Sequence, residues 1–182
     1  MPENASRLLT DGLRRCRQLG VTATRQVLAV SVSDQTLSLF EKLSGSWHLA
    51  GLTRCSTSRF GIGQMEGSNC TPLGLHRIVE KIGGGWPPGT VFKGRRPIGY
   101  TWKGLPDAKI TTRILWLEGL ESGFNRGGNL DSHARYIYIH GTADQINIGK
   151  PASIGCIHLA DADLIPLFDR LPSGTLVWIS KH

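Results

Sequence analysis

A histidine and a cysteine, sixteen residues apart, are the two side chains of this sequence best suited to chemistry. His140 ends the apolar, β-prone run 136–140, and Cys156 stands between Gly155 and Ile157. A thiol becomes a strong nucleophile when a neighbouring imidazole takes or balances its proton. Two strands joined by a connection of this length would place the two groups side by side. The pair therefore predicts a cysteine acyl-transfer enzyme.

The residues around the pair suit such a reaction. Ser153 and Gly155 are small, so a substrate can approach the backbone there. Glycine also permits unusual φ and ψ angles, which would leave its own N–H and that of Cys156 free to face a developing oxyanion. Gly141 and Thr142 follow the histidine and supply a turn in which a carbonyl or hydroxyl group orients the imidazole.

Other interpretations of these residues stay open. A buried structural cysteine and a core or surface histidine are the commoner fates of either residue taken alone. Cys156 and His158 alternate along an extended segment and, with His140, would make three ligands of a kind that zinc accepts. Catalytic zinc sites commonly include closely spaced or helical ligand pairs, and the sequence has no HExxH. Nucleophilic catalysis is therefore favoured over a metal site.

Two further patterns are weaker. The segment 61–67 resembles a dinucleotide-binding fingerprint, but its last glycine comes one position late and no strand–helix context surrounds it. Aromatic and basic residues between 86 and 116 are of the kind that stacks on nucleic acid, although packing in a core or loop is favoured. These residues are Trp86, Arg95, Arg96, Trp102 and Trp116.

Composition predicts one β-rich domain. The chain has 182 residues, of which 40% are hydrophobic and 19% charged, an ordinary globular mixture. Twenty-three scattered glycines and nine prolines indicate many turns. The formal charge of +7 favours anionic partners, among them nucleic acid or a carboxylate-rich peptide, although a solvated basic surface explains the charge equally simply.

The compartment expected from the sequence is the cytoplasm. The four cysteines form no CxxC pair, and free thiols suit a reducing compartment. Arginines interrupt the apolar positions near the N-terminus, so no secretion signal is expected, and no apolar run is long enough to span a membrane. Removal of a signal segment would instead place the protein in the periplasm.

Local patterns predict the elements that position the pair. Apolar residues at helical spacing predict a helix over about 4–19, and a second helix is expected over 161–171, whose first turn is acidic. Strands are expected at 27–32, 36–41, 47–55, 74–82, 110–117, 136–140 and 176–180, with loops at 56–73 and 118–133. Residues 1–25 are interpreted as a helical extension and residues 26–182 as the catalytic domain.

The sequence resembles the L,D-transpeptidase catalytic domain family, the YkuD-type fold. In that family a histidine in an HGT sequence precedes a cysteine in an SHGC sequence, which corresponds here to His140–Thr142 and Ser153–Cys156. The TPxG segment at 71–74, the hairpin at 30–41 and the strand at 174–179 also match, so the resemblance covers roughly residues 26–180. It implies a mixed β-sandwich with a peripheral N-terminal helix and a short helix after the cysteine.

The resemblance also implies roles for individual residues. Cys156 corresponds to the nucleophile, His140 to its base and Gly141 to the residue whose carbonyl orients the imidazole. Gly155 and Cys156 correspond to the backbone donors of the oxyanion hole, and Ser153 opens the cysteine motif. No cofactor or metal is implied.

The resemblance is greatest to a cytoplasmic branch associated with L,D-carboxypeptidase activity in peptidoglycan recycling. Segments 70–82, 87–96, 112–120 and 135–142 carry it. The implied substrate is a muropeptide stem that contains a diamino acid and a terminal D-alanine. Carbapenem-type inhibitors are possible ligands, and neither nucleic acid nor a membrane is an expected partner. Transfer of the acyl group to an amine, which would form 3–3 crosslinks or exchange a D-amino acid, is the alternative.

Two residues depart from the family pattern. Ile154 stands where the family has a second histidine, which removes a polar group beside the thiol. His158 stands where an arginine is usual, which replaces a permanent bidentate donor with a group that titrates near neutrality. The alternative to an active enzyme is therefore a catalytically weakened protein that binds muropeptides.

Overall fold

The computed structural model describes residues 3–182, and most of its regular structure is β. The predicted β-rich fold with two helices is confirmed. The helices are α1 (Glu3–Gln18) and α2 (Asp161–Arg170), and short 3₁₀ helices cover Gly128–Leu130 and Gln145–Asn147. The strands are β1 (Gln26–Ser31), β2 (Thr36–Leu43), β3 (Ser46–Arg54), β4 (Gly74–Ile82), β5 (Thr90–Lys93), β6 (Arg96–Tyr100), β7 (Thr111–Gly119), β8 (Tyr138–Gly141), β9 (Ile157–Leu159) and β10 (Leu176–Ser180).

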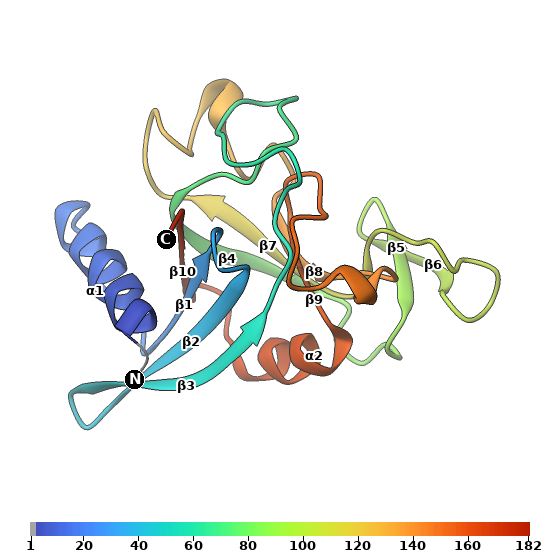
Figure 1. Ribbon diagram of the computed structural model, residues 1–182, viewed down its shortest axis with the longest axis horizontal. Helices are drawn as coiled ribbons and strands as arrows, with labels where there is room; N and C mark the ends of the chain where they lie inside the picture. Colours follow the sequence, from blue (N-terminus) through green and yellow to red (C-terminus); the bar gives the residue numbers. More distant parts are fainter. Residues whose placement is uncertain (1–2) are drawn as a thin grey trace.

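The ten strands form one mixed sheet (Figure 1). Its main path runs β3-β2-β1-β10-β4-β7-β5-β6, and β8 joins at β7 and carries β9 on its other side. The β1–β10 and β8–β9 pairs are parallel, whereas the other pairs are antiparallel. The short strands β8 and β9 therefore branch from the main path, and both carry residues of the predicted site.

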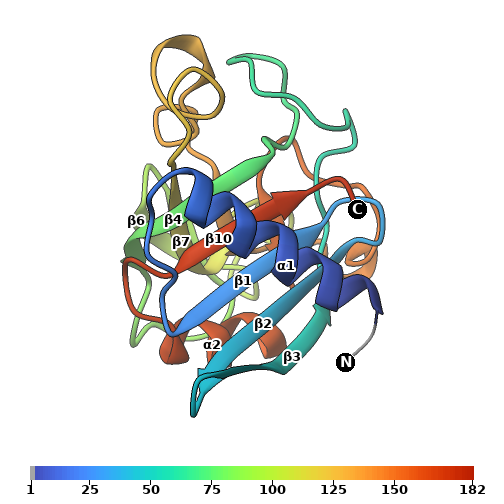
Figure 2. The same cartoon turned by 90° about the vertical axis from the view of Figure 1, so that its left-hand side faces the viewer.

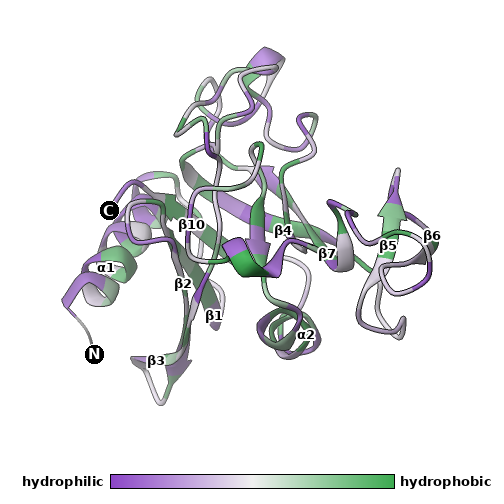
Figure 3. Cartoon of the chain, turned by 45° about the vertical axis from the view of Figure 1, so that its right-hand side comes forward, coloured by the Kyte–Doolittle hydropathy of each residue, from purple (hydrophilic) through white to green (hydrophobic). Residues whose placement is uncertain are grey.

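The two helices cover opposite faces of the sheet (Figures 1 and 2). Side chains alternate along β1: Leu28 and Val30 face the core that includes α2, whereas Ala29 faces α1. Figure 3 shows both hydrophilic and hydrophobic residues along α1, as expected of a helix with one face on the sheet and one in solvent. Because the apolar stripe of α1 shares a core with the sheet, the predicted N-terminal helix is docked on the domain.

An ion pair between the partly exposed Arg15 and the buried Glu121 connects α1 to the segment after β7. Glu121 is only 3% exposed, and its carboxylate accepts hydrogen bonds from Nε of Arg15 at 2.9 Å and from the N–H of Leu75 at 2.6 Å. Arg15 also forms an ion pair with this carboxylate through Nη2. The pair therefore connects α1, β4 and the loop beyond β7.

The Arg15→Met substitution is expected to destabilise the protein, because it leaves the buried carboxylate of Glu121 without its cation. Removing one partner of a pair that is buried on one side should lower the free energy of unfolding by about 2–3 kcal/mol. In a domain of this size, that corresponds to a fall of roughly 4–12 °C in Tm. Thermal and urea unfolding measure the effect. The control is Arg14→Met, which removes an exposed arginine whose one ion pair among residues 3–182 is with Asp11 of its own helix. Equal Tm values for the two variants would contradict this account.

Three local features differ from the sequence-based expectation. The β5–β6 hairpin and β9 were not expected, because the hairpin lies between glycines and prolines and β9 has only three residues. The strand expected at 136–140 begins at Tyr138, since Tyr136 has a φ of 58° and its N–H donates to the carbonyl of His133 in a turn. The other expected helices and strands are present, with bounds shifted by a few residues.

All four cysteines are free thiols, as expected from their spacing. Between residues 3 and 182, no helix has the length and apolar character needed to cross a lipid bilayer.

Candidate active site

The parallel pair β8–β9 brings the predicted histidine and cysteine to one face. Ile139 lies opposite Ile157 and His140 lies opposite His158. Because side chains alternate, the two isoleucines enter the core, where both are fully buried, and the two histidines face the other way. Cys156 stands two residues before His158 and shares its face, diagonal to His140. Strand spacing and rise place the α-carbons of such diagonal neighbours about 8 Å apart.

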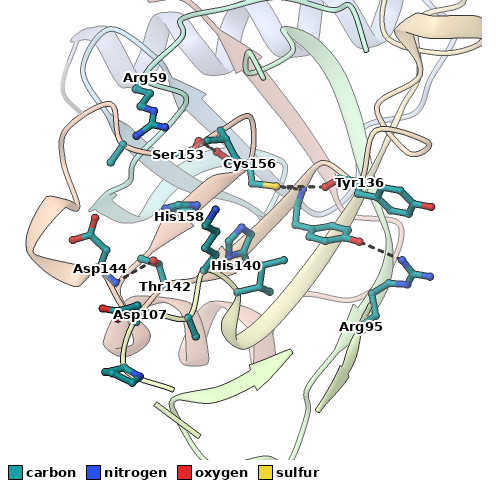
Figure 4. A pocket seen from close by; sticks show the side chains of 18 of the residues that line it. Arg59, Arg95, Asp107, Tyr136, His140, Thr142, Asp144, Ser153, Cys156 and His158 are labelled. Atoms are coloured by element: carbon teal, nitrogen blue, oxygen red, sulfur yellow. Dashed lines mark hydrogen bonds between the residues drawn. The ribbon is translucent and has the colours of Figure 1, made fainter. Parts of the chain in front are cut away.

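His140 and Cys156 line the same cavity, which has a volume of about 980 Å³ (Figure 4). His140 is 2% exposed and closes the inner wall, whereas Cys156 is partly exposed to the opening. The acyl-transfer interpretation required the two side chains to share a cleft, and the structure places them in one.

The environment of His140 sets its tautomer. Its Nδ1 lies 2.8 Å from the carbonyl oxygen of Gly141, so Nδ1 carries the proton and donates it to that carbonyl. Nε2 is then left with a free lone pair. Burial, together with the nearby imidazole of His158, lowers the pKa of His140 to about 3, so the ring is neutral at physiological pH. The carbonyl partner expected at Gly141 is therefore present, and His140 can act as a base through Nε2.

Gly141 is also required by its surroundings. A β-carbon at this position would lie 2.8 Å from Oδ1 of Asp161 and 2.8 Å from the carbonyl oxygen of Thr111. A side chain here would force Asp161, Thr111 or the Gly141 backbone, whose carbonyl orients the imidazole, to move.

The thiol of Cys156 is protonated at rest. Its sulfur lies 3.4 Å from the N–H of Tyr138, which donates to it, and 3.4 Å from the carbonyl of Tyr136, which the S–H can reach. Burial raises the pKa of Cys156 to about 11, against the opposing effects of the Tyr138 N–H and the charge of Arg135. The resting site therefore holds a neutral thiol and a neutral imidazole.

The loop before the cysteine corrects one expectation. Gly155 adopts the expected unusual conformation, with a φ of 127°, but its N–H is not free, because it donates to Oγ of Ser153 at 3.2 Å. That hydroxyl in turn donates to the carbonyl of Cys156 at 2.5 Å. Within the part of the chain that the structure describes, the N–H of Cys156 donates to no protein group. Of the two expected oxyanion donors, only that of Cys156 is available in this conformation.

The two departures from the family pattern both face the cavity. Ile154 is 49% exposed and offers no polar group to the thiol. The ring of His158 lies 4.6 Å from that of His140, centroid to centroid, at an angle of 55°. Burial lowers the pKa of His158 to about 4, with the carboxylate of Asp144 opposing the shift. His158 is therefore neutral near pH 7 and does not supply the permanent charge of an arginine.

Several residues of the cavity were not expected from the sequence. Tyr136 and Tyr138 line it together with His140. The spacing of two between Tyr138 and His140 places both on one face of β8, whereas Tyr136 reaches the cavity from the turn before the strand. Arg95 reaches the cavity from the unexpected β5–β6 hairpin, so no local pattern could place it there. Arg135 donates to the backbone carbonyls of residues 63, 64 and 70, and so holds the loop 56–73 beside the site.

The weaker sequence patterns do not form sites of their own. The zinc interpretation required Cys156, His158 and His140 to converge, and among residues 3–182 no three such side chains are arranged to hold a metal ion. The segment 61–67 lies in a loop and opens no helix, so it is not a dinucleotide-binding turn.

Known protein families and solved structures point to the same family as the sequence motifs around His140 and Cys156. The model of the family described as "L,D-transpeptidase catalytic domain" matches residues 25–179. No curated protein shows a significant match to the chain. One similar solved structure is Bd1075 from Bdellovibrio bacteriovorus, with a TM-score of 0.57 and 16% identity; the match covers 88% of this chain and 49% of that one. Another is L,D-transpeptidase 3 from Mycobacterium tuberculosis with a faropenem-derived adduct, with a TM-score of 0.51 and 17% identity over 86% of this chain and 60% of that one. A third is the helical cell shape determining protein Pgp2 from Campylobacter jejuni, with a TM-score of 0.53 and 15% identity over 87% of this chain and 48% of that one. At these identities the likeness shows a shared fold, and the chain spans about half to three fifths of the length of these proteins.

Proposed function

Because the chain belongs to the L,D-transpeptidase catalytic domain family, we propose that it is a cysteine L,D-carboxypeptidase that converts muropeptide tetrapeptides to tripeptides. The coarser assignment, cysteine-dependent chemistry on peptide bonds of peptidoglycan, follows from the family. The observation that supports the cysteine chemistry is the shared cavity of Cys156 and His140, in which Nε2 of the imidazole is free to take a proton. Hydrolysis, in preference to transfer to an amine, is proposed from the resemblance of segments 70–82, 87–96, 112–120 and 135–142 to the carboxypeptidase branch.

In the proposed reaction, the sulfur of Cys156 attacks the carbonyl carbon at the L-centre of the diamino acid. Nε2 of His140 takes the thiol proton as the S–C bond forms. The N–H of Cys156 stabilises the negative charge that develops on the carbonyl oxygen. The C–N bond then breaks, the imidazolium gives its proton to the departing amine of D-alanine, and a thioester remains.

Water completes the proposed cycle. His140 removes a proton from a water molecule that attacks the thioester carbonyl, and the C–S bond breaks to release the tripeptide. The sulfur recovers its proton from the imidazolium. Acylation and deacylation each begin with a neutral imidazole, which agrees with the lowered pKa of His140.

The charges of the cavity support a substrate that carries several carboxylates. Arg59, Arg95 and Lys109 line it, together with Asp107 and Asp144. The net charge of +7 would also favour an anionic stem peptide. Muropeptide recycling in the cytoplasm is part of the proposal, and the four free thiols are compatible with such a reducing compartment.

Mass spectrometry of the products tests the proposal. The wild-type protein is incubated with a disaccharide tetrapeptide in ¹⁸O-labelled water, with and without an added D-amino acid. Hydrolysis yields free D-alanine and a tripeptide that contains ¹⁸O. A mass-shifted tetrapeptide, seen only with the added D-amino acid, would instead establish acyl transfer.

A third result would support a muropeptide-binding protein instead of an enzyme. If no product forms, if imipenem fails to acylate Cys156, and if the muropeptide still binds, the protein is a muropeptide-binding member of the family. The polar group missing at Ile154 and the neutral His158 are the features that favour this outcome.

A further inference from the structure

Arg95 is a cation at the edge of the cavity that the proposed reaction does not use. It occupies the two-residue turn between β5 and β6, in which Gly94 and Arg95 have φ angles of 53° and 66°. Turns with two positive φ angles match the twist of a hairpin. The hairpin backbone therefore determines the point from which the Arg95 side chain extends toward the cavity.

Aromatic side chains hold the guanidinium of Arg95 in place. Its Cζ lies 4.5 Å from the ring centre of Trp116 and 5.4 Å from that of Tyr136. Nη1 lies 3.5 Å from the phenol oxygen of Tyr138, to which it donates, and Figure 4 shows this bond as a dashed line from Arg95. Stacking uses the face of a guanidinium and leaves N–H groups at its edge for other acceptors.

No carboxylate neutralises this cation. Between residues 3 and 182, none of the ion pairs includes Arg95, and Glu80 is close enough to act on its charge but not to pair with it. Asp107 and Asp144, the acidic residues of the cavity wall, lie on the other side of the Cys156–His140 pair (Figure 4). The guanidinium of Arg95 is thus held in position without a carboxylate partner. A guanidinium can donate two parallel hydrogen bonds to one carboxylate, which makes it the group that best recognises a carboxylate.

A single tyrosine separates Arg95 from the sulfur. The main-chain N–H of Tyr138 donates to Sγ of Cys156, while its phenol oxygen accepts from Arg95. A substrate carbonyl bound at the sulfur therefore has a guanidinium one tyrosine side chain away. The side chain of a diamino acid has a comparable reach. In diaminopimelate it ends in a carboxylate as well as an ammonium group, whereas in lysine it ends in an ammonium group alone.

We propose that Arg95 is a specificity residue that selects stems with a carboxylate at the end of the diamino-acid side chain, as in diaminopimelate, over stems with lysine. This inference rests on the proposed function and adds to it the identity of the stem. A carboxylate gains two parallel hydrogen bonds from the fork, whereas a lone ammonium group meets a like charge.

The test is the ratio of kcat/KM for two tetrapeptides that differ only in diaminopimelate or lysine at the third position. The wild-type protein is expected to favour the diaminopimelate stem by about tenfold or more, which is the effect of one charged hydrogen-bonded pair. Arg95→Met should reduce this ratio about tenfold, and Arg95→Lys should reduce it by less, because the charge remains while the fork is lost. Arg96→Met is the matched control, since it removes the neighbouring exposed arginine and should leave the ratio unchanged.

Binding of the two tripeptide products to Cys156→Ala protein gives a second readout that does not depend on turnover. Calorimetry should show about tenfold tighter binding of the diaminopimelate product, and this difference should disappear with Arg95→Met added. Equal ratios for Arg95→Met and wild type, or a wild-type preference for lysine, would overturn the inference while leaving the carboxypeptidase intact. Failure to cleave either stem, together with retained selective binding, would instead overturn the proposed function and support the role of Arg95.

Discussion

The Cys156→Ala protein is expected to lose hydrolysis of the muropeptide tetrapeptide, with kcat/KM lower by about 10⁴-fold or more. The proposed reaction passes through a thioester, and none of the other cysteines lines the cavity in which His140 lies. Without the sulfur, no covalent intermediate can form, and the remaining groups can only orient the substrate. Release of D-alanine, followed by mass spectrometry over several hours, measures the loss.

Two further variants make this result specific. Cys70→Ala removes the other partly exposed thiol, whose sulfur contacts the carbonyl of Phe60, and should retain most of the activity. His140→Ala should also lose most of the activity, because the thiol would then have no base. Persistent trimming of the tetrapeptide by Cys156→Ala would exclude the mechanism, and an equal loss in Cys70→Ala would place the essential thiol elsewhere.

The core of the site was predictable because short-range patterns determine it. Alternation of apolar and polar residues predicts the strand that carries His140, and the pattern also shows which of its faces is buried. Contacts with Asp161 and Thr111, which are distant in the sequence, leave no room for a side chain at Gly141. Its role in orienting the imidazole could nevertheless be predicted, because it directly follows the histidine. Residue types and spacing also indicated the cysteine between Gly155 and Ile157, and the resemblance to known domains added the expected role of each residue in that loop.

Other parts of the site depend on distances that no sequence pattern encodes. The N–H of Gly155 was expected to be free, but the hydroxyl of Ser153 lies close enough to accept it. Arg95 is placed by a hairpin whose turn contains neither Asn-Gly nor Asp-Gly, the usual signals of such turns. The unusually high pKa of Cys156 arises mainly from burial, a property of the assembled cavity. Composition and spacing therefore predict which groups meet but not their hydrogen-bonding or charge states.

Alkylation of Cys156 by iodoacetamide is expected to be slow at pH 7 and to accelerate about a thousandfold between pH 7 and pH 10. Burial raises the pKa of this thiol to about 11, so only about one molecule in 10⁴ carries the thiolate at pH 7. Because the thiolate is the reactive form, the rate should increase about tenfold with each pH unit until the pH nears that pKa. His140, whose pKa is lowered to about 3, stays neutral over this range and adds no inflection.

The measurement uses Cys70→Ser protein, so that the partly exposed second thiol does not contribute, and the buried Cys16 and Cys55 serve as slow internal references. A rate that is already level between pH 6 and pH 8 would show that a thiolate–imidazolium pair exists at rest and would contradict the neutral pair. Hydrolysis should not share the steep pH dependence of alkylation. In the proposed reaction, His140 removes the thiol proton during the attack, so the enzyme need not wait for a rare thiolate. A difference between the two pH profiles would therefore distinguish a thiol that is activated by general-base catalysis from one that is ionised before the substrate binds.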